Sequence, residues 1–253
     1  MKVQPKKHLG QHFLNDSSVC LEMAQRIEFH EGASKIIEIG PGTGALTQFL
    51  LGLDKDLEVY EVDSESVAYL HIHYPRQFKI HEMDFLKAPL EKAYEEPFVV
   101  AGNFPYNISS QILFKIYETK ELIPEVIGMF QKEVAERVAS PPGSKKYGIL
   151  SVLLQAFYDI EYILTVPPES FTPPPKVDSG VIHLKWNGVT DLGVDQRFFK
   201  KVVKAAFNLR RKTLRNSLKS IGEVPEPYTM RRPEQMSVQD FIELSKILIK
   251  AEQ

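Results

Sequence analysis

The sequence contains a single cysteine, Cys20, and no apolar run that approaches the ~20 residues a membrane-spanning helix needs. No disulfide can form within the chain, which is consistent with a reducing compartment. The basic N-terminus up to His8 is not followed by an apolar segment, so it does not resemble a secretory signal. The histidines and Cys20 show no metal-ligand spacing, so no metal is expected. We therefore expect a cytoplasmic protein with no membrane partner.

Acidic residues are also absent from one long stretch, between Asp195 and Glu223, although the formal net charge of the chain is −2. Nine basic residues lie there: Arg197, Lys200, Lys201, Lys204, Arg210, Arg211, Lys212, Arg215 and Lys219. Three more, Lys2, Lys6 and Lys7, precede the first acid of the chain. Such a run is often only a solvated helix face, but here Thr, Asn and Ser donors are interleaved with the charges. This pattern favours contact with nucleic acid.

Strand and helix patterns alternate through the first three quarters of the chain, whose length of 253 residues fits one large domain with an appendage. Buried strands are predicted at Lys35–Gly40, Leu57–Val62, Phe78–His81, Phe98–Gly102 and Val126–Phe130. Helical stretches such as Leu46–Gly52, Ser64–His73 and Ser109–Glu118 lie between them. This alternation predicts an α/β fold with a parallel sheet wrapped by helices. Two late strands, Glu161–Val166 and Gly180–Trp186, suggest an antiparallel hairpin at the sheet edge.

The pattern changes at Asn187-Gly188, after which only helices are expected, at Gln196–Phe207, Arg210–Ile221 and Val238–Lys250. We therefore predict two domains, residues 1–187 with the sheet and residues 188–253 as a small all-helical domain. A further helix, Ser17–Ile27, precedes the sheet and can be capped by Asn15 or Asp16.

A glycine-rich turn, Gly40-Pro41-Gly42-Thr43-Gly44, connects the first predicted strand of the sheet to a helix. Glycine lets such a turn approach a ligand closely, although many glycine triplets serve only as structural turns. The spacing is G-x-G-x-G rather than the G-x-G-x-x-G of pyrophosphate binders, so it favours a nucleoside without a pyrophosphate.

Carboxylates end the next two predicted strands. Glu61 lies 17 residues past Gly44, where an acid can accept hydrogen bonds from both ribose hydroxyls. Asp63 is close enough to compete for that role, and either acid could simply be solvated. Asp84 could accept from an adenine amino group or could cap the following helix.

The tetrad Asn103-Phe104-Pro105-Tyr106 directly follows a buried strand, where open α/β sheets bind ligands. Adenine N6 is a poor nucleophile because its lone pair is delocalised into the ring. The Asn103 side-chain oxygen and a backbone carbonyl near Pro105 could accept the N6 hydrogens and direct the lone pair at an electrophilic methyl group. Tyr106 could stack on the base, and Phe171 could cover its opposite face. The alternative is that both are ordinary core aromatics.

Five motifs in order resemble the ribosomal RNA adenine dimethyltransferases, and the resemblance covers nearly the whole chain. The motifs are Leu9-Gly10-Gln11-His12-Phe13-Leu14, Glu38-Ile39-Gly40-Pro41-Gly42-Thr43-Gly44, Asn103-Phe104-Pro105-Tyr106-Asn107-Ile108-Ser109, the segment from Phe171 to Ser179, and the segment from Asn208 to Leu218. Family members often carry Asn at the position of His12, and Ile or Leu at that of Phe104. We expect the latter position to tolerate an apolar exchange.

The resemblance implies a Rossmann-like class I methyltransferase sheet, S-adenosylmethionine as methyl donor, and a helical domain that docks RNA. It implies dimethylation of two adjacent adenines in a hairpin near the 3′ end of 16S rRNA in the small ribosomal subunit. We expect the protein to be a monomer. Donor contacts carried over by motif are His12, Leu14, Gly40, Glu61, Asp84 and Asn103. Asn103 and Tyr106 would hold the target base.

Two alternatives remain at this point. A relative that methylates 23S rRNA and confers macrolide resistance would have the same donor site, but the basic segment around Arg210-Arg211-Lys212 resembles the small-subunit group. An RNA-binding assembly factor on the same fold would not need Asn103 or the glycine turn.

Overall fold

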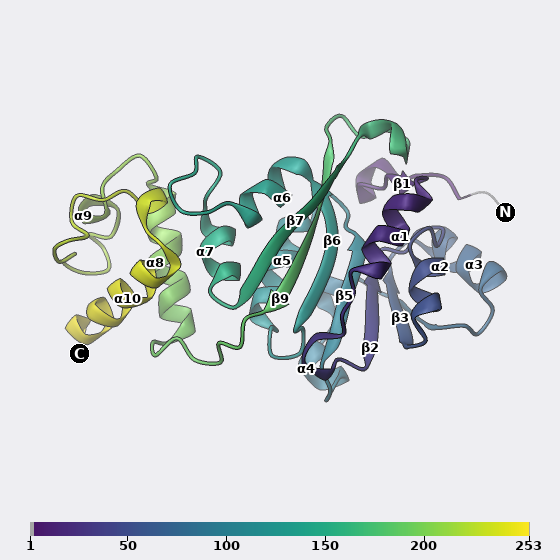
Figure 1. Ribbon diagram of the computed structural model, residues 1–253, viewed down its shortest axis with the longest axis horizontal. Helices are drawn as coiled ribbons and strands as arrows, with labels where there is room; N and C mark the ends of the chain where they lie inside the picture. The colour runs from purple at the N-terminus through teal and green to yellow at the C-terminus, as the bar shows by residue number, and fades with distance from the viewer. Residues whose placement is uncertain (1–2, 253) are drawn as a thin grey trace. The chain divides into compact units, whose positions relative to one another are not determined.

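The computed structural model describes residues 3–252, so Lys2 of the basic N-terminus lies outside the described residues. A seven-stranded sheet has the order β4-β3-β2-β5-β6-β9-β7 (Figure 1). Its strands are β2 Lys35–Ile39, β3 Asp56–Glu61, β4 Lys79–Glu82, β5 Phe98–Asn103, β6 Glu125–Gln131, β7 Tyr158–Val166 and β9 Ser179–Trp186. A separate antiparallel pair joins β1 (Phe13–Leu14) to β8 (Phe171–Thr172).

The sheet has the predicted parallel centre, because neighbouring strands from β4 to β6 pair in parallel. β9 runs antiparallel to β6, and β7 is its outer neighbour, so the two late strands lie at the sheet edge as expected. The strand order reverses direction between β2 and β5, and this topological switch point is where open α/β sheets bind ligands.

Ten α-helices connect or follow the strands in the described part of the chain. They are α1 Ser17–Gln25, α2 Thr47–Leu50, α3 Ser64–His73, α4 Leu90–Ala93, α5 Ser109–Glu118, α6 Lys132–Ala139, α7 Ile149–Gln155, α8 Gln196–Asn208, α9 Leu214–Ser217 and α10 Val238–Glu252. Side-chain caps begin several of them, because the first N–H groups of a helix have no partner within it. Asp16 accepts from the Ser18 N–H (3.0 Å) at α1, and Ser237 accepts from the Asp240 N–H (3.0 Å) at α10.

One apolar core lies between one face of the sheet and helices α1 and α2. Alternate residues of each strand point to this face, for example Ile36 of β2, Val59 of β3 and Val99 of β5, and all three are completely buried. Met23 and Leu50 cover them from the helices and are also completely buried.

The helix predicted at Arg210–Ile221 is wrong over most of its length, since only Leu214–Ser217 is α-helical. Thr213 is extended, with ψ at 157°, and it separates α9 from the turn after α8. The Leu214 N–H donates to the Arg231 carbonyl (2.8 Å) and the Arg215 N–H to the Thr229 carbonyl (3.2 Å). These non-local hydrogen bonds replace the i to i−4 bonds that a longer helix would make.

The chain forms two compact units that are not continuous in sequence. One contains the residues up to Ala135 together with Ile160–Trp186, and the other contains Glu136–Asp159 together with the residues from Asn187 onward. The predicted domains are continuous and place Glu136–Asp159 with the sheet. In the second unit this segment supplies α7, which packs against α8 and α10. Among the described residues, no helix has the length and apolarity to span a membrane.

Candidate active site

Three polar side chains are brought together by the alternation of residues along parallel strands. Glu38, Glu61 and Asn103 each lie two residues after a core residue of β2, β3 or β5. They therefore point to the same face of the sheet as that core, at the carboxyl ends of strands that flank the switch point. All three line one open cavity, whose space amounts to about 740 Å³ when the solvent at its mouth is included.

The glycine turn lines this cavity, and the backbone conformation of the turn explains why it is rich in glycine. Gly40 and Gly42 have φ of 66° and 56°, in the left-handed region that favours glycine. A Cβ on Gly42 would lie 2.8 Å from the Phe13 ring, so a side chain there would displace the N-terminal segment. The turn thus predicted from sequence does approach the cavity closely, since both glycines line it.

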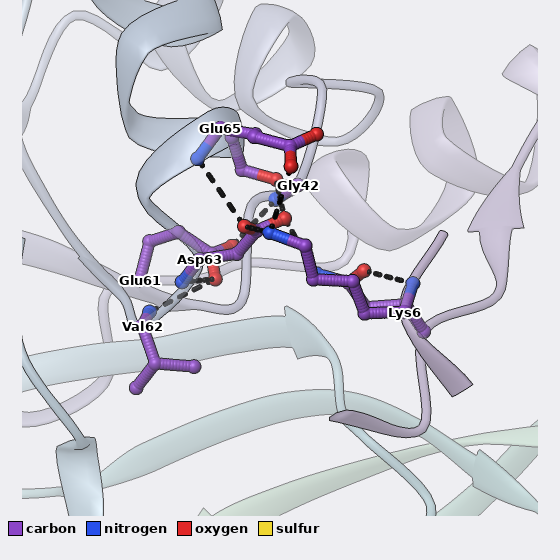
Figure 2. A network of polar contacts seen from close by, with 8 residues as sticks. Lys6, Gly42, Glu61, Val62, Asp63 and Glu65 are labelled. Atoms are coloured by element: carbon purple, nitrogen blue, oxygen red, sulfur yellow. Dashed lines mark hydrogen bonds and ion pairs between the residues drawn. The ribbon is translucent and has the colours of Figure 1, made fainter. Parts of the chain in front are cut away.

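Of the two competing acids, Glu61 lines the cavity, and it is 4% exposed. Figure 2 shows its hydrogen bonds. Its Oε1 accepts from the N–H groups of Val62 and Asp63 (both 2.9 Å), and its Oε2 accepts from the Gly42 N–H (3.1 Å). Burial raises the pKa of Glu61, and these three donors oppose the shift only in part. Asp63, the competing candidate, does not line the cavity, and its side chain binds Lys6 instead.

Glu38 is a cavity-lining acid to which the sequence analysis gave no role. It is 1% exposed, and its Oε2 accepts from the Thr47 hydroxyl at 2.6 Å. Burial raises the pKa of Glu38 to about 8, and the Thr47 bond only partly offsets this. An acid within the apolar run Ile36-Ile37-Glu38-Ile39 was the available indication, because charged residues are seldom fully buried without a purpose.

The tetrad also lines the cavity, and Asn103 and Tyr106 are both oriented by hydrogen bonds. The Asn103 Nδ2 donates to the His12 carbonyl (2.9 Å), which leaves the Asn103 Oδ1 as an acceptor. The Tyr106 hydroxyl shares a hydrogen bond with the buried Ser179 hydroxyl, and the Tyr106 ring stacks on that of His12 with centroids 5.3 Å apart. Burial raises the pKa of Tyr106, so this hydroxyl stays protonated at neutral pH.

Phe104 fills a buried space beside the tetrad, and its tolerance of an apolar exchange stays a prediction. It is 1% exposed, and its ring packs against Phe130 at 4.9 Å between centroids. Hypothetical Cβ atoms on Gly102 and Gly128 would lie 2.7 and 2.5 Å from the ring, so both glycines leave the space that it fills. The size of the Phe104 ring is therefore matched to the absence of side chains at Gly102 and Gly128.

The N-terminal segment also lines the cavity, and His12 and Leu14 are among its lining residues. The His12 Nδ1 forms a hydrogen bond with the Pro173 carbonyl (2.8 Å), and Leu14 pairs with Phe171 between β1 and β8. His12 thus contacts two other segments through its ring, namely the tetrad and the segment after β8.

The chain matches the family Ribosomal RNA adenine dimethylase over residues 2–246. A relative from Cytophaga hutchinsonii, named Ribosomal RNA small subunit methyltransferase A, is 53% identical over 253 residues, which cover 98% of this chain and 98% of the relative. This chain belongs to the ribosomal RNA adenine dimethylase family. The predicted resemblance and the predicted enzyme class, an S-adenosylmethionine-dependent rRNA adenine dimethyltransferase, are confirmed.

Two solved structures share the fold of this dimethylase family member at lower identity. A dimethyladenosine transferase from Plasmodium falciparum aligns with a TM-score of 0.80 and 23% identity, covering 95% of this chain and 98% of the other. The 23S rRNA methyltransferase ErmE aligns with a TM-score of 0.66 and 23% identity, covering 92% and 99%. The predicted class I methyltransferase fold is thereby confirmed.

Six of the eight predicted site residues of this dimethylase line the cavity, namely His12, Leu14, Gly40, Glu61, Asn103 and Tyr106. Asp84 does not line it; its side chain accepts from the Leu86 N–H (2.9 Å) and caps a short 3-10 helix, Phe85–Lys87. Phe171 is 3% exposed and packs in the apolar core. Among the described residues, no group of three or more His, Cys, Asp or Glu is arranged to hold a metal ion.

Proposed function

We propose that this chain transfers methyl groups from S-adenosylmethionine to the N6 amines of two adjacent adenines, in a hairpin near the 3′ end of 16S rRNA in the small ribosomal subunit. The observation that carries the proposal is the cavity at the switch point, which Glu61 and Asn103 both line. The name of the relative at 53% identity supports the small subunit. The 23S rRNA alternative has less support, because relatives at 52–53% identity carry the small-subunit name, whereas ErmE shares the fold at 23% identity.

On the donor side, we assign the buried Glu61 carboxylate to two vicinal ribose hydroxyls, and Gly40 and Leu14 to backbone and apolar contacts, because all three residues line the cavity. Such a donor carries an electrophilic methyl group on a sulfonium sulfur. We further assign Asp84 to the adenine amine of the donor. Because Asp84 binds the Leu86 N–H, this role requires that carboxylate to exchange or share its partner.

On the base side, the Asn103 Oδ1 and a backbone carbonyl near Pro105 accept the two N6 hydrogens of the target adenine. This draws the nitrogen lone pair out of conjugation and directs it toward the methyl group, so positioning and electrostatics provide the catalysis. As the N–C bond forms, the S–C bond of the donor breaks, S-adenosylhomocysteine leaves, and the methylated nitrogen releases one hydrogen as a proton to solvent. Tyr106 stacks on the base. We assign Phe171 to the opposite face, and its burial means that β1 and β8 must shift when the base enters.

The second unit is proposed as the RNA-docking domain, and we infer that the protein acts as a monomer in the cytoplasm. Arg211, Lys212, Arg215 and Lys219 are all exposed around α9. Arg210 differs from them, since its guanidinium donates to the Lys145 carbonyl within the same unit. Replacing Arg211, Arg215 and Lys219 with Ala should weaken RNA binding and lower the salt slope by about 2 to 3. An unchanged slope would remove this surface from the docking site.

Replacing Asn103 with Ala tests the reaction itself. With unmodified small subunits, labelled donor at saturation and mapping of labelled nucleotides, we expect the turnover rate to fall at least about a hundredfold. Asn107→Ala is the matched control, because Asn107 belongs to the same loop but donates only to the His8 carbonyl (3.2 Å) and does not line the cavity. Undiminished turnover of the Asn103 variant would rule out the amine-holding role, and label outside the adenine pair would rule out the substrate.

A further inference from the structure

The N-terminal segment is anchored to the tip of β3 through the side chain of Asp63 (Figure 2). The Lys6 ammonium forms an ion pair with the Asp63 Oδ1 and lies 3.2 Å from a Glu65 carboxylate oxygen. The Gln11 Nε2 donates to the other oxygen, Asp63 Oδ2 (3.2 Å), while the Gln11 Oε1 accepts from the Lys6 backbone N–H (2.8 Å). Two residues of one short segment therefore hold both oxygens of a single carboxylate.

Asp63 also has partners outside the N-terminal segment. Its side chain is fully buried, and it also accepts from the Glu65 N–H (3.2 Å) and the Ser66 hydroxyl (3.0 Å) at the start of α3. Burial by itself would raise the pKa of Asp63, but the bonds from Lys6, Gln11 and α3 outweigh it and lower the pKa. A helix cap alone would need neither Lys6 nor Gln11.

The same short loop holds the ligand-facing acid and the N-terminal segment. The Asp63 backbone N–H donates to Glu61 Oε1 (2.9 Å), whereas the Asp63 side chain binds Lys6 and Gln11. The segment so fixed continues into the run from Leu9 to Leu14, every residue of which lines the cavity. Neither Lys6 nor Asp63 lines the cavity itself.

We propose that Lys6 and Asp63 are positioning residues for the methyl donor, because their ion pair holds the cavity-lining run from Leu9 to Leu14 in place before the donor arrives. The inference rests on the proposed function, which takes a methyl-donating nucleoside as the ligand of this cavity. A preformed wall spares the complex the entropy of ordering that run, so affinity falls with the fraction of molecules in which the wall is formed.

Lys6→Ala in the full chain tests this, with Lys7→Ala as the matched control, because Lys7 is the exposed neighbouring residue with the same charge. We expect Lys6→Ala to raise the calorimetric Kd for S-adenosylhomocysteine about 3- to 10-fold. Amide hydrogen exchange at residues 6–14 should accelerate in the free protein. The KM for the donor should rise while kcat at saturation stays unchanged. Lys7→Ala should differ from wild type by less than about twofold, and Lys6→Arg should restore affinity.

Asp63→Asn provides a second variant, since it keeps the backbone N–H that holds Glu61 and an oxygen that can cap α3. It should reproduce the exchange and affinity changes of Lys6→Ala. If Lys6→Ala had the wild-type affinity for S-adenosylhomocysteine and the wild-type rate of amide exchange, the inference would be overturned and the proposed function would stand. Failure of the wild-type chain to bind S-adenosylhomocysteine would overturn the proposed function, and the inference with it.

Discussion

Four buried glutamates occur on the strands of the sheet, and they divide into two contrasting pairs. Glu58 and Glu125 have basic partners: Glu58 binds Lys35 (2.5 Å) and His81 (2.6 Å), and Glu125 binds His183 (2.8 Å). Glu38 and Glu61, at the cavity, form no ion pair with any described cation and accept only from hydroxyl or backbone donors.

The contrast separates acids that maintain the fold from acids that remain available for a ligand. Burial alone would raise the pKa of all four. For Glu58 and Glu125 the partners outweigh burial, so the pKa of Glu58 falls to about 2 and that of Glu125 is also lowered. For Glu38 and Glu61 burial prevails and the pKa is raised. A buried acid without a basic partner is therefore a more specific indication of the candidate site than an acidic residue in general.

The largest loss of stability is expected from replacing one of the paired acids. Glu125→Ala would leave His183 and the N–H groups of Glu28 and His30 without their buried acceptor, at a cost of about 3–5 kcal/mol in the free energy of unfolding. Urea denaturation measures this. Glu28→Ala is the control, since it removes only an exposed pair with Lys185 and should cost about 1 kcal/mol or less. Equal losses would abolish the distinction between paired buried and exposed acids.

Glu38→Gln sharpens the comparison through pH. Because the pKa of Glu38 is about 8 in the folded chain and has its ordinary value of 4.5 in the unfolded chain, the unfolded chain ionises first as pH rises. Wild-type stability relative to the variant should therefore fall between about pH 4.5 and 8, by up to about 1.4 kcal/mol per pH unit. Urea denaturation should show that, between pH 5 and pH 8, the free energy of unfolding of the variant rises relative to that of wild type by on the order of 3 kcal/mol. A difference independent of pH would mean that Glu38 is ionised in the folded protein.

Glu58→Gln should show the opposite dependence and the smallest effect. Its pKa is lowered in the folded chain, so its contribution is present above about pH 4.5 and is lost as pH falls toward 2. We expect the variant to be less stable than wild type by about 1–2 kcal/mol at pH 7, with the difference shrinking in acid. A difference that grew in acid would place Glu58 with the unpaired acids.

Local patterns were sufficient for much of the fold. The helices Ser64–His73 and Ser109–Glu118 have the predicted bounds, and the parallel strands lie within two residues of prediction, because their apolar periodicity agrees with their burial. The predicted helix at Arg210–Ile221 failed because its backbone N–H groups bind carbonyls at Thr229 and Arg231. No local pattern encodes such partners.

Sequence by itself determined the α/β fold, the glycine turn and the tetrad, since each depends on short-range periodicity or on the backbone freedom of particular residue types. Tertiary structure alone decided that Glu61 and not Asp63 lines the cavity, and that Glu38 lines it as well. It also decided that Asp84 and Phe171 lie outside the cavity lining. Whether a side chain is desolvated, paired or left open depends on neighbours from distant parts of the chain, and only the packed sheet specifies those neighbours.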